Sequence, residues 1–518
     1  MNHILEIIVA LPFLAAVAIL FVPEGKHLPM RVIAAVGAGL SLIGAIIVAF
    51  SYDRAVGGLQ LLSTIPVVPS LGIHLTLAVD GWGVSLLLLT GLIIFTGVFA
   101  SWTLEKRVKE FYFFLLVLVT GVYGVFVSLD LFIFFLFYEI AVLPMYLLIG
   151  IWGSSNKVAD DGPFRFVWKL LDVGGKEYAA MKLTLMLLIG SAFIIAGMAA
   201  MYIEAGSTTF DMRTLQEFHF SRGMQLWAFP LLWIGFGTLG GVWPFHTWSP
   251  DGHASAPTAV SMLHAGVLMK LGAFGVIRVG MMLLPEGARE WVWLVGGVAA
   301  VNVLYGAFSA MSQKDLKYVI AYSSVSHMGI VMLGAATLTV SGWNGAIYQM
   351  FAHGLMTGLF FALVGLIYER ADHKRNIPEF GGFAKKMPAV AVFFTLACLS
   401  SLGLPGLAGF VAEWLVFLGA WEGPSASWPW LAVIGMVGAW ITSIYVLRAI
   451  KNIFWGPGPD IKWKHLSDPK GLEWVPLVVL GLCLIVFGAW PSLLLDFIDL
   501  ATSEYLPAVA GKALEVLR

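Results

Sequence analysis

The chain has 518 residues, of which 59% are hydrophobic and only 12% are charged, against roughly 25% charged in an ordinary soluble domain. This composition predicts a polytopic membrane protein and excludes a soluble globular enzyme. The net charge of −1 gives no basis for nucleic-acid binding. The two cysteines, Cys398 and Cys483, lie in apolar segments without ligand spacing, so we predict no disulfide framework, no iron–sulfur site and no zinc site.

In chain order, the sequence contains fourteen apolar segments near the length that crosses a bilayer, about 20 residues. They lie near 4–22, 31–50, 82–102, 111–129, 131–150, 179–203, 226–246, 257–282, 291–309, 316–339, 344–368, 388–420, 428–450 and 472–498. The first has no basic residue before it, so we expect a retained span and not a cleaved signal. The predicted fold class is all-α, with about fourteen transmembrane helices.

The positive charges are distributed unevenly between the loops. Of the 30 Lys and Arg residues, 22 fall in the odd-numbered loops, 7 fall in the even-numbered loops and the C-terminus, and Lys270 lies inside a segment. By the positive-inside rule, the odd loops are cytoplasmic and both termini lie outside.

Two of the segments are interrupted. The seventh breaks at Gly240–Gly241 and Pro244, and the twelfth breaks around Pro405 in SLGLPGLAGF. An offset of five segments gives opposite orientations, which is the pattern of inverted repeats with discontinuous helices. We therefore predict three N-terminal helices in 1–110, one repeat of five helices in 111–282, a second in 291–453, and a final helix in 472–498.

Four ionisable residues lie at similar depth in different segments: Glu139, Lys270 and His353, and Glu413 on the C-terminal half of the interrupted twelfth segment. Hydrocarbon satisfies neither free backbone groups nor an unpaired ammonium, so such residues survive only against protein or a water-filled cavity. A row of such groups at similar depth is typical of a lateral proton relay. The alternative for each is a side chain that a neighbouring helix satisfies, without a role in transport.

Three further residues are open to two interpretations. His327 shares its segment with a stripe of serines and is either a packing residue or a relay member. His264 lies six residues before Lys270, which is not on the same face of a regular helix. Lys182 begins the sixth segment, as an interfacial lysine or as a partner for Glu139.

The turn within the seventh segment holds His246, Asp251 and His253. These are metal-ligand types, but the spacing and the apolar flanks favour a bent helix end over a metal site. No glycine-rich phosphate loop and no nucleophile motif occurs in the sequence.

Long strings of the sequence resemble one family, the antiporter-like membrane subunits of respiratory complex I, and most nearly its M type (chain 4). They are YEIAVLPMYLLIGIWG at 138–153, WPFHTWSPDGHASAPT at 243–258, HAGVLMKLGAFGVIR at 264–278, QKDLKYVIAYSSVSHMG at 313–329, AHGLMTGLFFALVGLIYER at 352–370 and GLPGLAGFVAEW at 403–414. The L type would carry an added C-terminal lateral helix, for which we expect no residues here.

The resemblance implies a proton-translocating subunit without a cofactor of its own; flavin, iron–sulfur clusters and quinone are expected on partner subunits. It implies L-type and N-type neighbours, contact with lipid and a place in a bacterial inner membrane. Glu139 resembles the glutamate that couples to the neighbouring subunit, Lys270 the connecting lysine and Glu413 the terminal acid. His327 and His353 resemble histidines of the central axis.

One position departs from the family. Its broken seventh helix carries a lysine seven residues before the histidine aligned with His246, and this chain has Leu239 there. Leucine cannot take a proton, so we expect another residue to bind the proton in the first half-channel, with His264 as the candidate. The rival interpretations are the D-type chain of a multi-chain cation/proton antiporter and the membrane arm of a hydrogenase; a pure scaffold is the least favoured.

Overall fold

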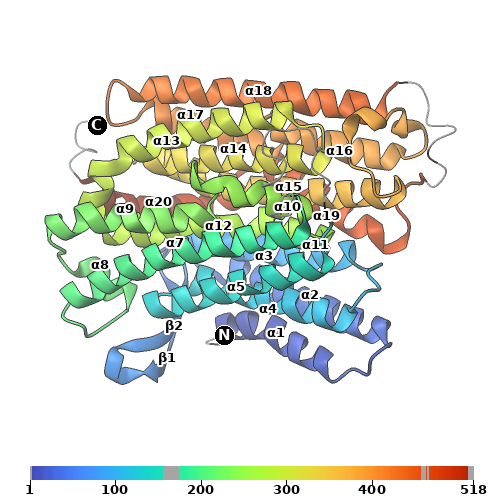
Figure 1. Ribbon diagram of the computed structural model, residues 1–518. Coiled ribbons are helices and arrows are strands. Elements are labelled where there is room, and N and C mark those ends of the chain that lie inside the picture. Colours follow the sequence, from blue (N-terminus) through green and yellow to red (C-terminus); the bar gives the residue numbers. More distant parts are fainter. Residues whose placement is uncertain (1–2, 156–173, 457–462, 464–465, 512–518) are drawn as a thin grey trace, which may run out of the picture.

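The computed structural model describes residues 3–155, 174–456, 463 and 466–511. Its helices lie side by side with their long axes running across the view of Figure 1. The unbroken spanning helices are α1 (Ile4–Leu20), α2 (His27–Ser51), α3 (Gly81–Ala100), α4 (Val108–Val127), α5 (Leu131–Trp152), α7 (Lys176–Glu204), α13 (Pro285–Ser312), α14 (Leu316–Ala336), α15 (Val340–Arg370), α18 (Trp428–Phe454) and α19 (Trp474–Ala489). The predicted class, an all-α polytopic membrane protein, is confirmed.

The remaining three predicted segments are interrupted helices. The seventh is α9 (Arg222–Leu239) followed by α10 (Trp248–Ser255), and the twelfth is α16 (Pro388–Ser401) followed by α17 (Ala408–Trp421). The eighth alternates α-helical and π-helical turns: α11 (Thr258–Leu263), η3 (His264–Leu268), α12 (Met269–Gly275) and η4 (Val276–Met281). Within the described residues, eleven helical stretches are long and apolar enough to cross a membrane.

Three elements differ from the sequence-based expectation. An antiparallel hairpin of β1 (Gln60–Val68) and β2 (Ile73–Val79) and the short helix α8 (Met212–Glu217) were not predicted. The predicted single helix 472–498 is wrong, because α19 ends at Ala489 and a separate helix α20 (Ser492–Ala510) follows. The hairpin and α8 lie at one end of the bundle in Figure 1.

The bundle has an interior built from a few helices. The segment 258–281 and α15 are buried along their spanning stretches, and α14 is nearly so. Lys270, His353 and His327 lie on these three elements. The interior of the bundle, shielded from lipid by the other helices, therefore contains the ionisable groups.

At the first break, between α9 and α10, the side chain of Asn302 on α13 forms hydrogen bonds with the free backbone groups. The backbone N–H of Trp243 donates to Asn302 Oδ1 at 2.9 Å, and Asn302 Nδ2 donates to the carbonyls of Gly241 and Val325 at 3.4 and 2.9 Å. Gly241 has a φ of +72°, which a residue with a Cβ rarely adopts. Asn302 thus satisfies backbone groups that a continuous helix would have paired.

The odd-numbered loops meet at one end of the bundle. Trp152 Nε1 donates to the Lys106 carbonyl at 2.7 Å, and the Leu316 N–H donates to the Arg375 carbonyl at 2.8 Å. The two interruptions agree with the predicted repeats, whose boundaries stay predictions.

Candidate functional site

The centre of the site is a contact between Lys270 of α12 and His353 of α15. Lys270 Nζ lies 2.7 Å from His353 Nδ1 and also donates to the Ala265 carbonyl. Both side chains are buried, with exposed fractions of 0% and 1%. An ammonium that donates to an imidazole nitrogen requires that nitrogen to be unprotonated, so this contact shares one proton between two bases.

The row continues from His353 toward the second broken helix. The ring of His327 lies 5.3 Å from that of His353 between centroids. His327 Nδ1 lies 3.1 Å from Gln349 Nε2 and 3.5 Å from Glu413 Oε1. Four residues of the predicted relay are therefore contiguous: Lys270, His353, His327 and Glu413.

A second pair of imidazoles precedes Lys270. His253 Nδ1 and His264 Nδ1 lie 2.8 Å apart, and both side chains are fully buried. The π-helical turn that begins at His264 widens the helix between this residue and Lys270. A π turn inside a helix is frequent at functional sites and alters the face that each residue presents. The structure therefore gives His264 a titratable partner that the sequence-based relay did not include.

Glu139 is separate from this row in the described part of the chain. It lies half-buried on α5, where its Oε1 accepts a hydrogen bond from Ser191 Oγ of α7 at 2.5 Å. Leu239 is fully buried at the end of α9. Among the described residues, Glu139 and Lys270 share no hydrogen bond or ion pair, since Glu139 is bonded to Ser191 and Lys270 to Ala265 and His353.

Of the two interpretations of Lys182, the structure does not support direct pairing with Glu139. Lys182 Nζ instead lies 2.7 Å from Asp251 Oδ2, and Tyr318 Oη donates to the other carboxylate oxygen at 2.8 Å. A lysine and an aspartate, each about a quarter exposed, form an ion pair at the edge of the bundle where α7, α10 and α14 meet. His246 packs against Tyr305 and not against this pair.

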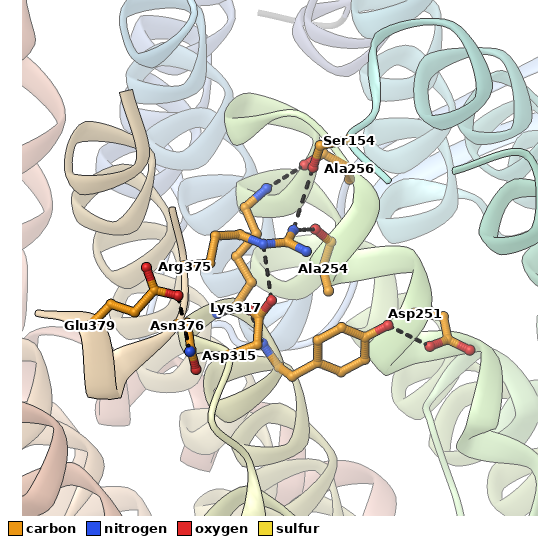
Figure 2. A network of polar contacts seen from close by, with 10 residues as sticks. Ser154, Asp251, Ala254, Ala256, Asp315, Lys317, Arg375, Asn376 and Glu379 are labelled. Carbon is orange, nitrogen blue, oxygen red and sulfur yellow. Dashed lines mark hydrogen bonds and ion pairs between the residues drawn. The ribbon is translucent and has the colours of Figure 1, made fainter. Parts of the chain in front are cut away.

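The end of α10 is fixed by groups from two loops and from the start of α14 (Figure 2). Arg375 Nη1 donates to the Ala254 carbonyl at 2.6 Å, and Lys317 Nζ donates to the Ala256 carbonyl at 2.8 Å. Between them, the Ser255 carbonyl accepts from the Ser154 N–H at 2.7 Å. Cations at a helix C-terminus bind carbonyls that lack helical partners and oppose the negative end of the helix dipole.

A carboxylate completes this network. Arg375 Nε lies 3.0 Å from Asp315 Oδ2. Burial raises the pKa of the Asp315 carboxyl above its usual range, although the Arg375 guanidinium and the N–H groups of Lys317 and Tyr318 act in the opposite direction. The network holds α10 in place, and α10 carries both Asp251 and His253.

Comparison with known proteins identifies the family. Residues 128–442 match the family model described as NADH:quinone oxidoreductase/Mrp antiporter, TM. The chain belongs to this family.

Individual relatives refine the placement. NAD(P)H-quinone oxidoreductase chain 4 1 of Synechococcus sp. (strain JA-2-3B'a(2-13)) is 36% identical over 519 residues, covering 99% of this chain and 93% of the relative. A chain of respiratory complex I from Thermus thermophilus with bound NADH matches with a TM-score of 0.84 and 28% identity, covering 97% of this chain and 99% of that one. The predicted resemblance to the M type, chain 4, is confirmed.

The fold alone does not distinguish the two branches of the family, the NADH:quinone oxidoreductase subunits and the Mrp antiporter subunits. A chain of the Mrp complex from Dietzia sp. DQ12-45-1b matches with a TM-score of 0.83, covering 98% of this chain and 99% of that one, but at 20% identity. Since both structures fit about equally well in shape, sequence identity favours the oxidoreductase branch.

Two contributors to the site were missed by sequence reasoning. Asn302 is a single amide within an apolar helix, and only its fully buried position would have marked it. His253 was noted in the turn, and its partner follows in sequence eleven residues later, beyond a proline and a change of helix.

Proposed function

We propose that this chain is the proton-translocating M-type subunit in the membrane arm of an NADH:quinone oxidoreductase. The observation that carries the proposal is the buried row from Lys270 through His353 and His327 to Glu413. Each member binds and releases a proton, and neighbouring members are close enough for transfer directly or through one water. Membership of the family, and relatives named as oxidoreductase chains, support this branch.

In this proposal, quinone reduction elsewhere in the complex drives the charge changes. Glu139 lies at the bundle surface on α5, where a neighbouring subunit can reach it, and a change in its charge would act on Lys270 through the field and not by contact. Lys270 then passes its proton to His353, and Glu413 releases it at the second broken helix. The redox groups (flavin, iron–sulfur clusters and quinone) are assigned to partner subunits, and L-type and N-type chains to the two sides.

The proposal also covers orientation. The excess of Lys and Arg in the odd loops supports placing that end in the cytoplasm of a bacterium, with the protein in the inner membrane and both termini outside.

Two experiments test the proposal. A tagged chain is isolated gently from native membranes, and the eluate is assayed for flavin, iron–sulfur signals and NADH-driven quinone reduction. Co-elution of all three is expected; cation/proton exchange by an eluate without redox centres would favour the antiporter branch. In the assembled complex, Lys270→Ala is expected to abolish or strongly reduce pumping, and normal pumping at normal assembly would contradict the relay.

A further inference from the structure

A cavity of about 690 Å³, lined by both apolar and charged residues, opens at the end of the bundle where the odd-numbered loops meet. Its lining includes Thr103, Ser154, Ala256, Thr258, Lys317 and Glu369. Its rim is exposed and titratable, with Glu369 and His373, whereas Lys317 in its wall is buried. The network of Figure 2 therefore forms one side of this cavity, because Ser154, Ala256 and Lys317 belong to both.

A second, smaller cavity adjoins the first. It has a volume of 20 Å³ and shares Ala100, Thr103, Thr258 and Glu369 with the larger one. A water molecule requires roughly 10–15 Å³ of such space, so the smaller cavity has room for about one. Thr103, Thr258 and Glu369 are thus the polar side chains common to the two cavities, and Glu369 is the ionisable one among them.

A hydrogen-bonded serine joins the cavity lining to the backbone of α10. Ser261 Oγ lies 3.1 Å from the carbonyl of Ala256, a lining residue, and 2.9 Å from the carbonyl of His253. The His253 ring packs edge-on against Phe361, with centroids 5.8 Å apart, and the next residue of α15, Ala362, lines the smaller cavity. The lining residues Ala256 and Ala362 are therefore connected, through Ser261 and through the neighbouring Phe361, to the backbone and the ring of His253.

We propose that these two cavities are the proton-uptake route of this subunit, with Glu369 as the proton-binding residue at their junction. The proposal rests on the proposed function. The Glu369 carboxylate takes a proton from water in the larger cavity and returns to its ionised form by giving that proton to water in the smaller one. No other bond changes, and one proton moves inward toward His253. The adjacent Arg370 is bound to Glu473 at 2.6 Å and not to Glu369, which leaves the Glu369 carboxylate to face the cavities.

The test uses the whole complex in liposomes, with proton translocation and NADH oxidation measured together. Glu369→Gln is expected to slow pumping about tenfold or more, because loss of a positioned acid–base group typically costs roughly 10²–10⁴ in rate. Glu369→Asp, which keeps the carboxyl, is expected to retain most of the pumping. The matched control is Asp372→Asn, which removes an exposed charge from the same loop outside the lining, at a positive φ that asparagine tolerates.

A second variant avoids the carboxylate altogether. Thr103→Trp fills the junction of the cavities and is expected to slow pumping as Glu369→Gln does, and it carries the test if the glutamine variant fails to assemble. Normal pumping by Glu369→Gln and Thr103→Trp, in a complex where Lys270→Ala stops it, overturns this route and leaves the proposed function intact. If Lys270→Ala also pumps normally, the proposed function itself is wrong.

Discussion

His253 of α10 and His264 of the π turn η3 meet through their imidazole rings, since their Nδ1 atoms lie 2.8 Å apart. One of these nitrogens must donate and the other accept, so the pair holds one proton between α10 and the π turn. Neither ring has a partner for its Nε2 among the described residues. These two nitrogens are therefore the points at which a proton can enter and leave the pair.

The first prediction concerns this pair. His253→Gln keeps a hydrogen-bonding side chain but cannot titrate, so pumping is expected to fall about tenfold or more while NADH oxidation by uncoupled membranes continues. The control is His219→Gln, an exposed histidine between α8 and α9. Equal pumping by the two variants would exclude His253 from the relay and return it to a packing role.

The second prediction concerns the acid at the far end of the row. Glu413 is 5% exposed and lies 3.5 Å from His327, so Glu413→Gln is expected to block proton release and to reduce pumping about as strongly as Lys270→Ala. Glu413→Asp keeps the acid but shortens its reach and is expected to pump at an intermediate rate. Glu422→Gln, at the exposed end of the same helix, supplies the control. Unimpaired release in Glu413→Gln would mean that protons leave through another residue.

The third prediction concerns the residue that departs from the family. Leu239 is fully buried, and an unpaired charge at such a place costs several kcal/mol. Leu239→Lys is therefore expected to lower the amount of assembled complex in membranes, whereas Leu239→Met, which conserves volume, is expected to cost less than about 1.5 kcal/mol. The measurement is the amount of flavin and of tagged chain recovered from a fixed amount of membrane. Full assembly and faster pumping by Leu239→Lys would instead indicate that a carboxylate there is ready to receive the lysine.

The spans and the breaks were predictable because each depends on local physics. A bilayer requires about 20 apolar residues per helix. A glycine pair with a proline interrupts such a run, and the break at Gly240–Gly241 and Pro244 lies where it was expected. The uneven distribution of Lys and Arg predicts that all odd-numbered loops lie on the same side of the membrane. In the structure, contacts between these loops place them at one end of the bundle.

The missed elements depend on partners that local sequence does not specify. The strands β1 and β2 form an apolar stretch that periodicity alone does not distinguish from helix. The helix α20 lies against α3 and α15, where Thr502 accepts from Trp82 Nε1 and Asp499 accepts from Asn344 Nδ2. The contact of His253 with His264 requires a π turn, which no spacing rule predicts.

The last prediction concerns the buried ion pair between Asp80 and Arg278. The guanidinium donates to Asp80 Oδ2, the two side chains are 0% and 6% exposed, and the carboxylate also caps α3 through the Gly83 N–H at 2.8 Å. The guanidinium carbon lies 5.5 Å from the centre of the Trp82 ring and 5.3 Å from that of Tyr505 on α20. The pair thus ties α3, the π turn after Lys270 and the C-terminal helix together.

Removing one partner from a buried pair leaves an uncompensated charge and costs about 3–5 kcal/mol. Arg278→Met is therefore expected to lower the thermal midpoint of the complex in detergent, and Asp80→Asn likewise, although asparagine still caps α3. The double variant is expected to lose less stability than the sum of the losses in the two single variants, because neither charge then remains unpaired. Additive losses in this cycle would show that Asp80 and Arg278 act independently, and that the contacts of Arg278 with the aromatic rings provide its contribution to stability.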